Sequence, residues 1–141
     1  MALYSRILVP LDGTPVDEPL LEHVEQLAAA CEATVVLLRV AHFHTRDSRT
    51  HELDDCREYA ERAKVRLDGH GFAVETVVAS GEPAETIIAQ AHEQRADLIA
   101  MATHGHGAVS RLVLGSVADH VRHNAIVPLL FVKAGTAGPE G

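Results

Sequence analysis

The sequence predicts an α/β fold built on a five-stranded, doubly wound parallel sheet. Two observations support this prediction. Five short apolar runs, each about as long as a buried strand, recur along the 141 residues. Amphipathic segments with apolar residues three and four positions apart separate them. Such alternation favours parallel strands joined by right-handed crossovers, with helices on both faces of the sheet.

The expected strands differ in how continuously apolar they are. Residues 34–41 are almost uninterrupted, which is typical of a central parallel strand covered on both faces. Residues 72–79 alternate more, which indicates an edge strand. Pro128 has no N–H to donate, so it belongs at a strand start or on an edge. The five expected strands are residues 6–11, 34–41, 72–79, 97–101 and 127–132.

The expected helices begin at turn or capping residues. Pro15 fits a first helical turn with Thr14 as the N-cap, and Pro83 fits a second helix start. Ser116 fits the N-cap of the last helix, and its spacing from Asp119 resembles a capping box. The buried stripes of the first three helices are Leu20, Val24, Leu27, Ala28 and Cys31; Leu53, Cys56, Ala60, Ala63 and Leu67; and Ala84, Ile87, Ile88 and Ala91.

Composition and charge narrow the classes of function. A hydrophobic fraction of 47% can fill one core, so we expect one domain over residues 1–135 and a disordered tail over 136–141. The net charge of −8, with no cluster of Lys and Arg, argues against a nucleic-acid partner. We see no secretory signal and no apolar stretch of the roughly 18 residues that a membrane helix needs. We therefore expect no membrane insertion and a cytoplasmic location.

Cysteine and histidine do not form a recognisable metal or disulfide pattern. Cys31 and Cys56 are expected toward opposite ends of one face of the sheet, so we expect two free thiols that pack as small hydrophobes. The ten histidines include His120 and His123, three positions apart, but no HExxH or Cys/His motif accompanies them. We favour solvated histidines over a metal site.

The glycine-bearing stretch 102–116, between an expected strand and the last helix, carries the most functional information. Its glycines let backbone N–H groups approach a ligand, and a helix start presents unpaired N–H groups with partial positive charge. Ligands of doubly wound sheets bind at the carboxyl ends of strands where the strand order reverses. With the order 3-2-1-4-5, which residue patterns alone do not determine, that point lies between Asp12-Gly13 and this stretch. The stretch is a candidate phosphate cradle; the alternative is a loop that only turns the chain.

Three motifs, taken in order, resemble the universal stress protein family. They are Ile7-Leu8-Val9-Pro10-Leu11-Asp12-Gly13, Ala102-Thr103-His104-Gly105 with Leu114-Gly115-Ser116-Val117, and Pro128-Leu129-Leu130-Phe131-Val132. The match covers residues 4–133. The resemblance implies a Rossmann-like fold of the adenine-nucleotide α-hydrolase type and a homodimer formed through the last strand, Leu129–Val132. An exposed edge strand there invites pairing with a second copy.

In the nucleotide-binding branch of that family the phosphate motif is Gly-x2-Gly-x9-Gly-[Ser/Thr]. Gly105, Gly115 and Ser116 match it, whereas Ala102 replaces the first glycine and adds one methyl group near the ligand. The segment lacks the GK[ST] of a Walker loop. The resemblance therefore implies ATP whose phosphates lie over Gly105 and Gly115-Ser116-Val117.

The same resemblance implies positions for the rest of the nucleotide. The adenine would lie against the backbone near Val40, and Asp12 would lie close to the ribose or a bound Mg²⁺. From the residues alone, Asp12 is equally well explained as a turn or helix-capping residue. The implied site consists of Pro10, Leu11, Asp12, Val40, Met101, Ala102, Thr103, His104, Gly105, His106, Gly115, Ser116 and Val117.

Three functional hypotheses follow. The first is a stress-response module that binds ATP as a dimer and signals to a protein partner that the sequence does not identify. The second is an enzyme that hydrolyses ATP slowly or transfers a phosphoryl group, with Asp12 holding a metal and His104 or His106 as acid or base. The third is a regulatory dimer that binds no nucleotide, which Ala102 and His106 favour. The sequence shows no Ser/His/Asp order with a nucleophile elbow, and the phosphate loop has no catalytic lysine.

His106 stands where the family often has Arg or Lys, and the nearest other cation in the segment is Arg111. A histidine with an ordinary pKa is largely neutral at pH 7. We predict that ATP affinity rises as the pH falls from mildly alkaline to mildly acidic, because a protonated imidazole returns a cation to the triphosphate. Titrations with ATP at both pH values check this, and equal affinities would contradict it.

Overall fold

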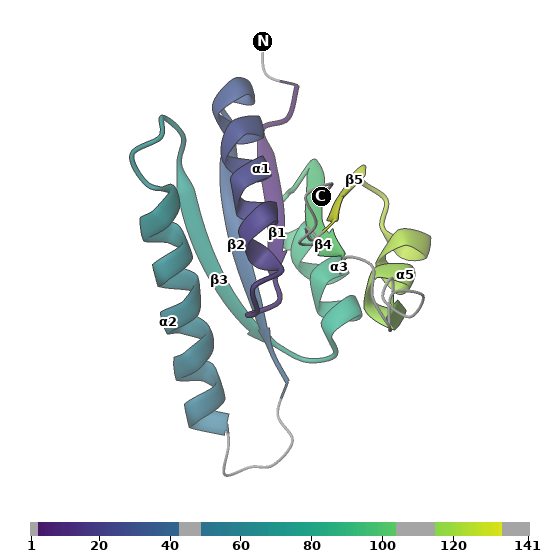
Figure 1. Cartoon of the computed structure of the whole chain (residues 1–141). Helices are drawn as coiled ribbons and strands as arrows, with labels where there is room; N and C mark the ends of the chain where they lie inside the picture. Colours follow the sequence, from purple (N-terminus) through teal and green to yellow (C-terminus); the bar gives the residue numbers. More distant parts are fainter. Residues whose placement is uncertain (1–2, 43–48, 104–114, 134–141) are drawn as a thin grey trace, which may run out of the picture.

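The computed structural model describes residues 3–42, 49–103 and 115–133. Within them, five parallel strands form one sheet in the order β3-β2-β1-β4-β5, and helices cover both of its faces (Figure 1). The strands are β1 (Arg6–Leu11), β2 (Thr34–Ala41), β3 (Val74–Ser80), β4 (Leu98–Thr103) and β5 (Leu129–Lys133). The helices are α1 (Asp17–Cys31), α2 (Arg49–Leu67), α3 (Pro83–Glu93) and α5 (Gly115–Asn124). The predicted fold class and strand order are confirmed.

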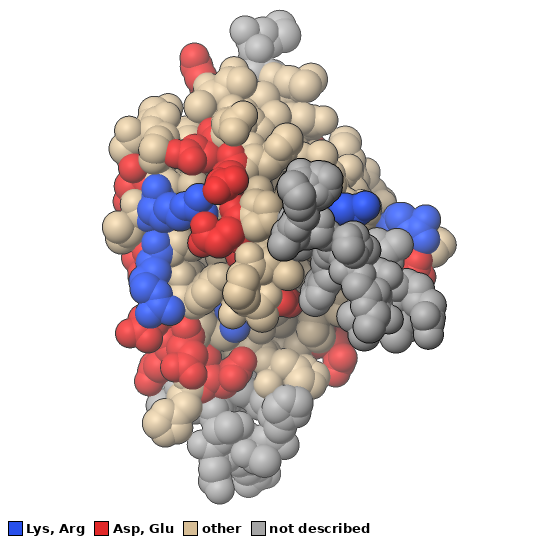
Figure 2. All heavy atoms as spheres, viewed as in Figure 1, with Lys and Arg blue, Asp and Glu red and all other residues tan. Residues whose placement is uncertain are grey.

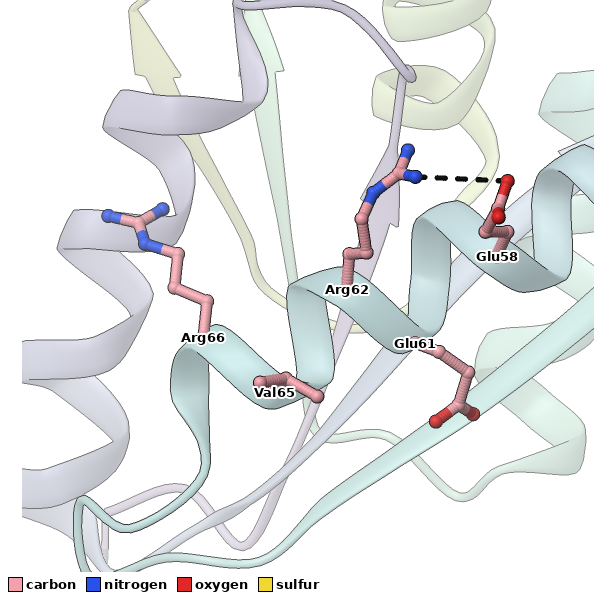
Figure 3. A pocket seen from close by; sticks show the side chains of 5 residues that line it. All are labelled: Glu58, Glu61, Arg62, Val65 and Arg66. Carbon is pink, nitrogen blue, oxygen red and sulfur yellow. Dashed lines mark ion pairs between the residues drawn. The ribbon is translucent and has the colours of Figure 1, made fainter.

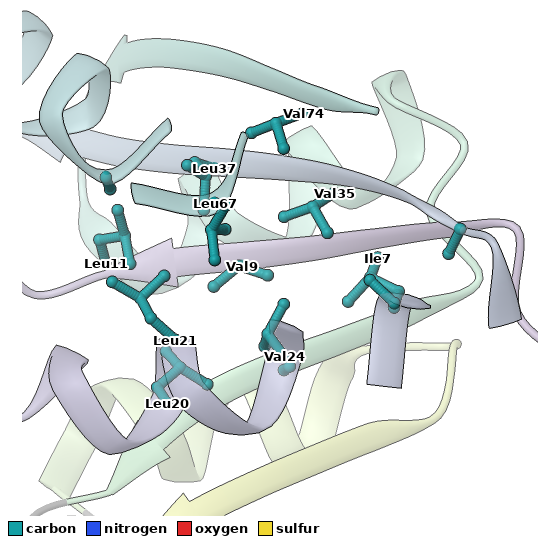
Figure 4. Close-up of a cluster of buried hydrophobic side chains, with 14 of the residues drawn as sticks. Ile7, Val9, Leu11, Leu20, Leu21, Val24, Val35, Leu37, Leu67 and Val74 are labelled. Carbon is teal, nitrogen blue, oxygen red and sulfur yellow. The ribbon is translucent and has the colours of Figure 1, made fainter. Parts of the chain in front are cut away.

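Two apolar layers separate the sheet from its helices, because alternate residues of a strand face opposite sides. The α1–α2 layer contains Ile7, Val9, Val35, Leu37, Leu20, Val24 and Leu67 (Figure 4). The α3–α5 layer contains Leu8, Val36, Leu38, Ile99, Ile87 and Val121. All of these side chains are almost completely buried. β1 and β2 are therefore covered on both faces, which explains why their sequences are apolar at nearly every position.

Two predicted helix starts are wrong. The chain first forms a turn in which the carbonyl of Thr14 accepts the N–H of Asp17 at 3.0 Å, so α1 follows Val16 and Thr14 is not its N-cap. Helix α5 begins at Gly115, which places Ser116 inside its first turn. Asp119 accepts a hydrogen bond from Arg122 at 2.6 Å instead of completing a capping box. Pro83 does begin α3, as expected.

Strand ends shift by up to two residues from the predicted ones. The carboxylate of Asp97 accepts the N–H groups of Ser5 and Arg6 at 2.8 and 3.0 Å, so β4 begins after it. Pro128 lies just before β5, as predicted, and its carbonyl accepts the N–H of Ile99 at 3.1 Å. β3 is an edge strand, also as predicted, and β5 forms the opposite edge.

Both thiols are free and buried, as the sequence predicts. Burial raises the pKa of the Cys56 thiol, and the nearby Arg39 only partly offsets this effect. A buried thiol with a raised pKa is a poor nucleophile, so Cys56 acts as a packing residue. No helix in the described part of the chain is long and apolar enough to cross a membrane.

Candidate functional site

The strand order reverses between β1 and β4, and we call the carboxyl ends of these two strands the switch point. From β1 the chain crosses to β2 through α1, which packs on one face of the sheet. From β4 it crosses to β5 through α5, which packs on the other face (Figure 1). The two connections thus leave neighbouring strands in opposite directions, which is the arrangement in which doubly wound sheets bind ligands.

Pro10 ends the pairing between the two strands at the switch point. β1 pairs with β2 as far as Leu11, but its register with β4 ends at Leu8 opposite Ile99. The carbonyl of Arg6 accepts the N–H of Asp97 at 2.9 Å. Alternate residues of a strand direct their backbone N–H and C=O groups to the same neighbouring strand. The backbone of Pro10, four residues after Arg6, therefore also points toward β4. Proline has no N–H to donate, so the ladder lacks a hydrogen bond there.

The described site residues come together at this point from four elements. Pro10 and Leu11 end β1, Val40 lies near the end of β2, Met101, Ala102 and Thr103 end β4, and Gly115, Ser116 and Val117 begin α5. Met101, Val40 and Val117 belong to the α3–α5 layer. Pro10 and Thr103 share that side, being two residues along their strands from Leu8 and Met101. The α3–α5 side is therefore where most of these side chains meet.

Leu11 and Ala102 lie against the opposite, α1–α2 layer. Their side chains do not join the group on the α3–α5 side, so only their backbone could contribute to a ligand site there. His104, Gly105 and His106 fall outside the described residues. A phosphate at this position would meet the start of α5, whose first N–H groups have no partner within the helix.

Asp12 directly follows β1, and its side chain is exposed. The hydroxyl of Thr14 donates to Asp12 Oδ2 at 2.8 Å, which orients the carboxylate. Gly13 has φ +83°, a conformation that favours glycine. A Cβ atom at residue 13 would lie 3.1 Å from the guanidinium of Arg39 and would crowd it.

Asp17 is the one charged side chain that is buried among the described residues, with 1% of its surface exposed. Its Oδ1 accepts the N–H of Asp12 at 2.9 Å, and its Oδ2 accepts the N–H of Gly13 at 2.8 Å. The hydroxyl of Tyr59, from α2, donates to the same Oδ2 at 2.6 Å. Sequence reasoning missed this residue, because an acidic residue in a first helical turn normally indicates a favourable charge at an exposed helix end.

Arg39 completes the support of the turn from β2. Its Nη1 donates to the carbonyl of Leu11 at 3.2 Å, and its Cζ lies 5.5 Å from the centre of the Tyr59 ring. The guanidinium thus packs between the end of β1 and an aromatic face, an arrangement that cation–π attraction favours. Asp17, Tyr59 and Arg39 together form what we call the turn support.

A shallow hollow of about 460 Å³ lies elsewhere, on the outer side of α2 (Figure 3). Its lining residues are Glu58, Glu61, Arg62, Val65 and Arg66. They all come from one helix, and both arginines are paired, Arg62 with Glu58 at 3.8 Å and Arg66 with Glu18 at 3.0 Å. In Figure 2 the basic side chains of this face lie among acidic ones. The hollow therefore offers no unpaired cation and little enclosure, and we assign it no ligand.

No group of three or more His, Cys, Asp and Glu side chains that could hold a metal ion occurs within residues 3–42, 49–103 and 115–133. A divalent cation at Asp12 would therefore need further ligands from outside these residues, and Mg²⁺ is commonly held by one or two carboxylates together with substrate phosphates.

The universal stress protein family model matches residues 3–133. The chain belongs to the universal stress protein family. Universal stress protein MJ0531 of Methanocaldococcus jannaschii is 30% identical to it, over 93% of this chain and 83% of the relative. The solved structure of MJ0577, from the same organism, has a TM-score of 0.76 and 29% identity, over 96% of this chain and all of that one.

A second solved structure is a universal stress protein from Archaeoglobus fulgidus in complex with dAMP. It has a TM-score of 0.74 and 22% identity, over 93% of this chain and 99% of that chain. At this identity the likeness shows the shared fold.

Tyr59 provides a test of the turn support in this universal stress protein. Burial, and then the hydrogen bond to the Asp17 carboxylate, raise the pKa of Tyr59 well above its ordinary value. In the unfolded chain the Tyr59 hydroxyl loses its proton at about pH 10, whereas in the native state it keeps the proton at that pH. The stability that Tyr59 confers is thus complete below about pH 10 and is lost as the pH rises above that value toward the native pKa.

We predict that a Tyr4→Phe variant, in which Tyr59 is the sole tyrosine, shows no tyrosinate absorbance while folded at about pH 10. Its urea midpoint should fall between about pH 9 and about pH 11 more steeply than that of a Tyr4→Phe, Tyr59→Phe double variant. Ionisation of Tyr59 at about pH 10 in the folded protein would show that the buried hydrogen bond to Asp17 is absent.

Proposed function

We propose that this universal stress protein binds an adenine nucleotide, ATP with Mg²⁺, at the switch point and acts as a nucleotide-dependent stress-response module in the cytoplasm. One observation carries the proposal. The ends of β1, β2 and β4 and the start of α5 bring the described parts of the family's nucleotide motif to the place where this fold class binds ligands.

The start of α5 supports the placing of the phosphates. This helix runs for ten residues, from Gly115 to Asn124, so its aligned peptide dipoles give its first turn a partial positive charge. In the proposed complex the N–H groups of Gly115, Ser116 and Val117 meet the phosphates. Gly105 takes the place of the second motif glycine beside the phosphates, between His104 and His106.

The α3–α5 side of the switch point supports the placing of the nucleoside. Val40 is partly exposed on this side, whereas Pro10 and Met101 are buried beside the strand ends, so an adenine ring placed here would lie against an apolar lining of the kind usual in small-molecule sites. The exposed carboxylate of Asp12 can accept hydrogen bonds from ribose hydroxyls or contribute one oxygen to Mg²⁺. The dAMP complex of a protein with the same fold is consistent with an adenine nucleotide as the ligand class.

The proposed assembly is a homodimer that pairs two copies of β5. This strand forms an edge of the sheet, and Leu129, Leu130, Phe131 and Val132 are only partly buried within one chain. An apolar edge strand with unpaired backbone groups is a template for another strand. A second copy would satisfy those groups and cover the apolar side chains.

We predict that the purified protein takes up one adenine nucleotide per chain and binds ATP with Mg²⁺ in a calorimetric titration. Gly115→Val should weaken this binding by at least about tenfold, because a branched side chain at the start of α5 occupies the space beside the phosphates. Asp12→Asn should weaken it by about tenfold in the presence of Mg²⁺, through the loss of a charged oxygen. Native mass spectrometry of the same samples gives both the nucleotide stoichiometry and the dimer mass.

The matched control is Asp54→Asn, which makes the same change at an exposed residue of α2 that pairs with Arg57 at 3.5 Å. It should leave the affinity unchanged. Absence of nucleotide from the wild-type protein, together with no binding in the titration, would contradict the proposal and favour a regulatory dimer that binds no nucleotide. Steady ATP turnover that Asp12→Asn abolishes would instead favour an enzyme.

A further inference from the structure

The proposed nucleotide contacts include Asp12 but give no role to Asp17, the buried carboxylate five residues later. Asp17 accepts three hydrogen bonds through its two oxygens, from the N–H groups of Asp12 and Gly13 and from the hydroxyl of Tyr59. Burying a carboxylate is costly unless such donors replace its water. Hydrogen bonds to a charged acceptor are also stronger than neutral ones, so this set of contacts rigidly fixes the Asp12–Gly13 turn.

The donors come from opposite directions. Two of them belong to the turn that presents Asp12 at the switch point, and the third comes from α2, 42 residues further along the chain. Arg39, from β2, donates a hydrogen bond to the carbonyl of Leu11, just before the turn, and packs on the Tyr59 ring. The α1–α2 side of the sheet therefore holds the turn that carries the exposed side chain of Asp12, which is a ligand contact in the proposed complex.

The position of Asp12 depends on this support because the pairing of β1 with β2 ends one residue earlier, at Leu11. Pro10 ends the pairing of β1 with β4, so β4 does not hold the residues that follow. Thr14 orients the Asp12 carboxylate, but Thr14 belongs to the same turn and moves with it. Removing the acceptor at Asp17 would release both backbone N–H groups and allow the carboxylate of Asp12 to leave its place.

We propose that Asp17 is a positioning residue for the nucleotide site, which it holds in the binding conformation together with Tyr59 and Arg39 without touching the ligand. The inference rests on the proposed function. It adds that nucleotide affinity is set in part by a contact between α1 and α2, across the sheet from the α3–α5 side where the ligand lies. A change at Tyr59, on a helix that the ligand does not contact, would then alter nucleotide affinity.

The test uses Asp17→Asn and Tyr59→Phe, each in the full chain. Asparagine keeps the shape of Asp17 but replaces one acceptor oxygen with an NH₂ group, which faces donors at that position. Phenylalanine removes only the Tyr59 hydroxyl. Matched controls are Asp54→Asn, Tyr4→Phe and Val24→Ala, the last of which removes buried methyl groups from the same helix as Asp17 and leaves the turn intact.

Three quantities are measured for each variant: ATP affinity by calorimetry, hydrogen exchange of the Asp12 and Gly13 amides by NMR, and urea stability. Asp17→Asn should weaken ATP binding and accelerate both amides by about tenfold or more, with a smaller change of about threefold for Tyr59→Phe. Val24→Ala should lower the urea midpoint while leaving affinity and these two amides unchanged. If Asp17 served stability alone, Asp17→Asn would lower the urea midpoint as Val24→Ala does and would leave ATP affinity and the two amides unchanged.

Unchanged affinity in both Asp17→Asn and Tyr59→Phe, with normal binding by the wild-type protein, overturns the inference alone. If Asp17→Asn does not fold, Tyr59→Phe decides, and affinity equal to that of Tyr4→Phe overturns the inference. No nucleotide binding by the wild-type protein overturns the proposed function, and the inference falls with it.

Discussion

The carboxyl end of β1 is the point on which the proposed site depends. β1 lies at the centre of the sheet and is buried on both faces, so its backbone groups need partners on both neighbouring strands. Pro10 cannot supply the N–H that would face β4, and the pairing of these strands ends before it. The turn that follows is therefore not paired with β4, and its N–H groups donate to the Asp17 carboxylate instead.

The two faces of the sheet contribute different kinds of side chain near the end of β1. On the α3–α5 side, Val40, Met101 and Val117 form a largely apolar surface next to the start of a helix. On the α1–α2 side, the charged and aromatic side chains of the turn support hold the Asp12–Gly13 turn in place. In the proposed complex, recognition and positioning rest on different residues, so that a polar network supports the apolar ligand site without lining it.

The periodicity of the sequence was enough to predict the elements and the layers they form. Residues 34–41 are apolar at most positions because β2 is covered on both faces, and the alternating residues of β3 reflect its place at an edge. The strand order came from the resemblance to a family and not from periodicity. The helix caps failed at Thr14 and Ser116 because several residues near each start could serve, and only the geometry of the turn decides between them.

The candidate site was predictable to the extent that it follows strand ends. The resemblance to the family implied Pro10, Val40 and Met101 as site residues, and each lies near the carboxyl end of a strand. Asp17 could not, because its burial depends on Tyr59 and on two backbone N–H groups that only the folded chain brings to it. Local sequence shows a charge near a helix start, whereas long-range contacts decide whether that charge lies in water or supports a buried turn.

The most direct test of the account is an NMR titration of the isotope-labelled protein with ATP and Mg²⁺, followed residue by residue. The account predicts that the largest shift changes occur at Asp12, Val40, Met101, Thr103 and Val117, where the ends of three strands and the start of α5 meet. It also predicts small changes at the amino ends of the strands and along the outer side of α2. Changes centred on the α2 hollow, or none at all at saturating ATP, would contradict it.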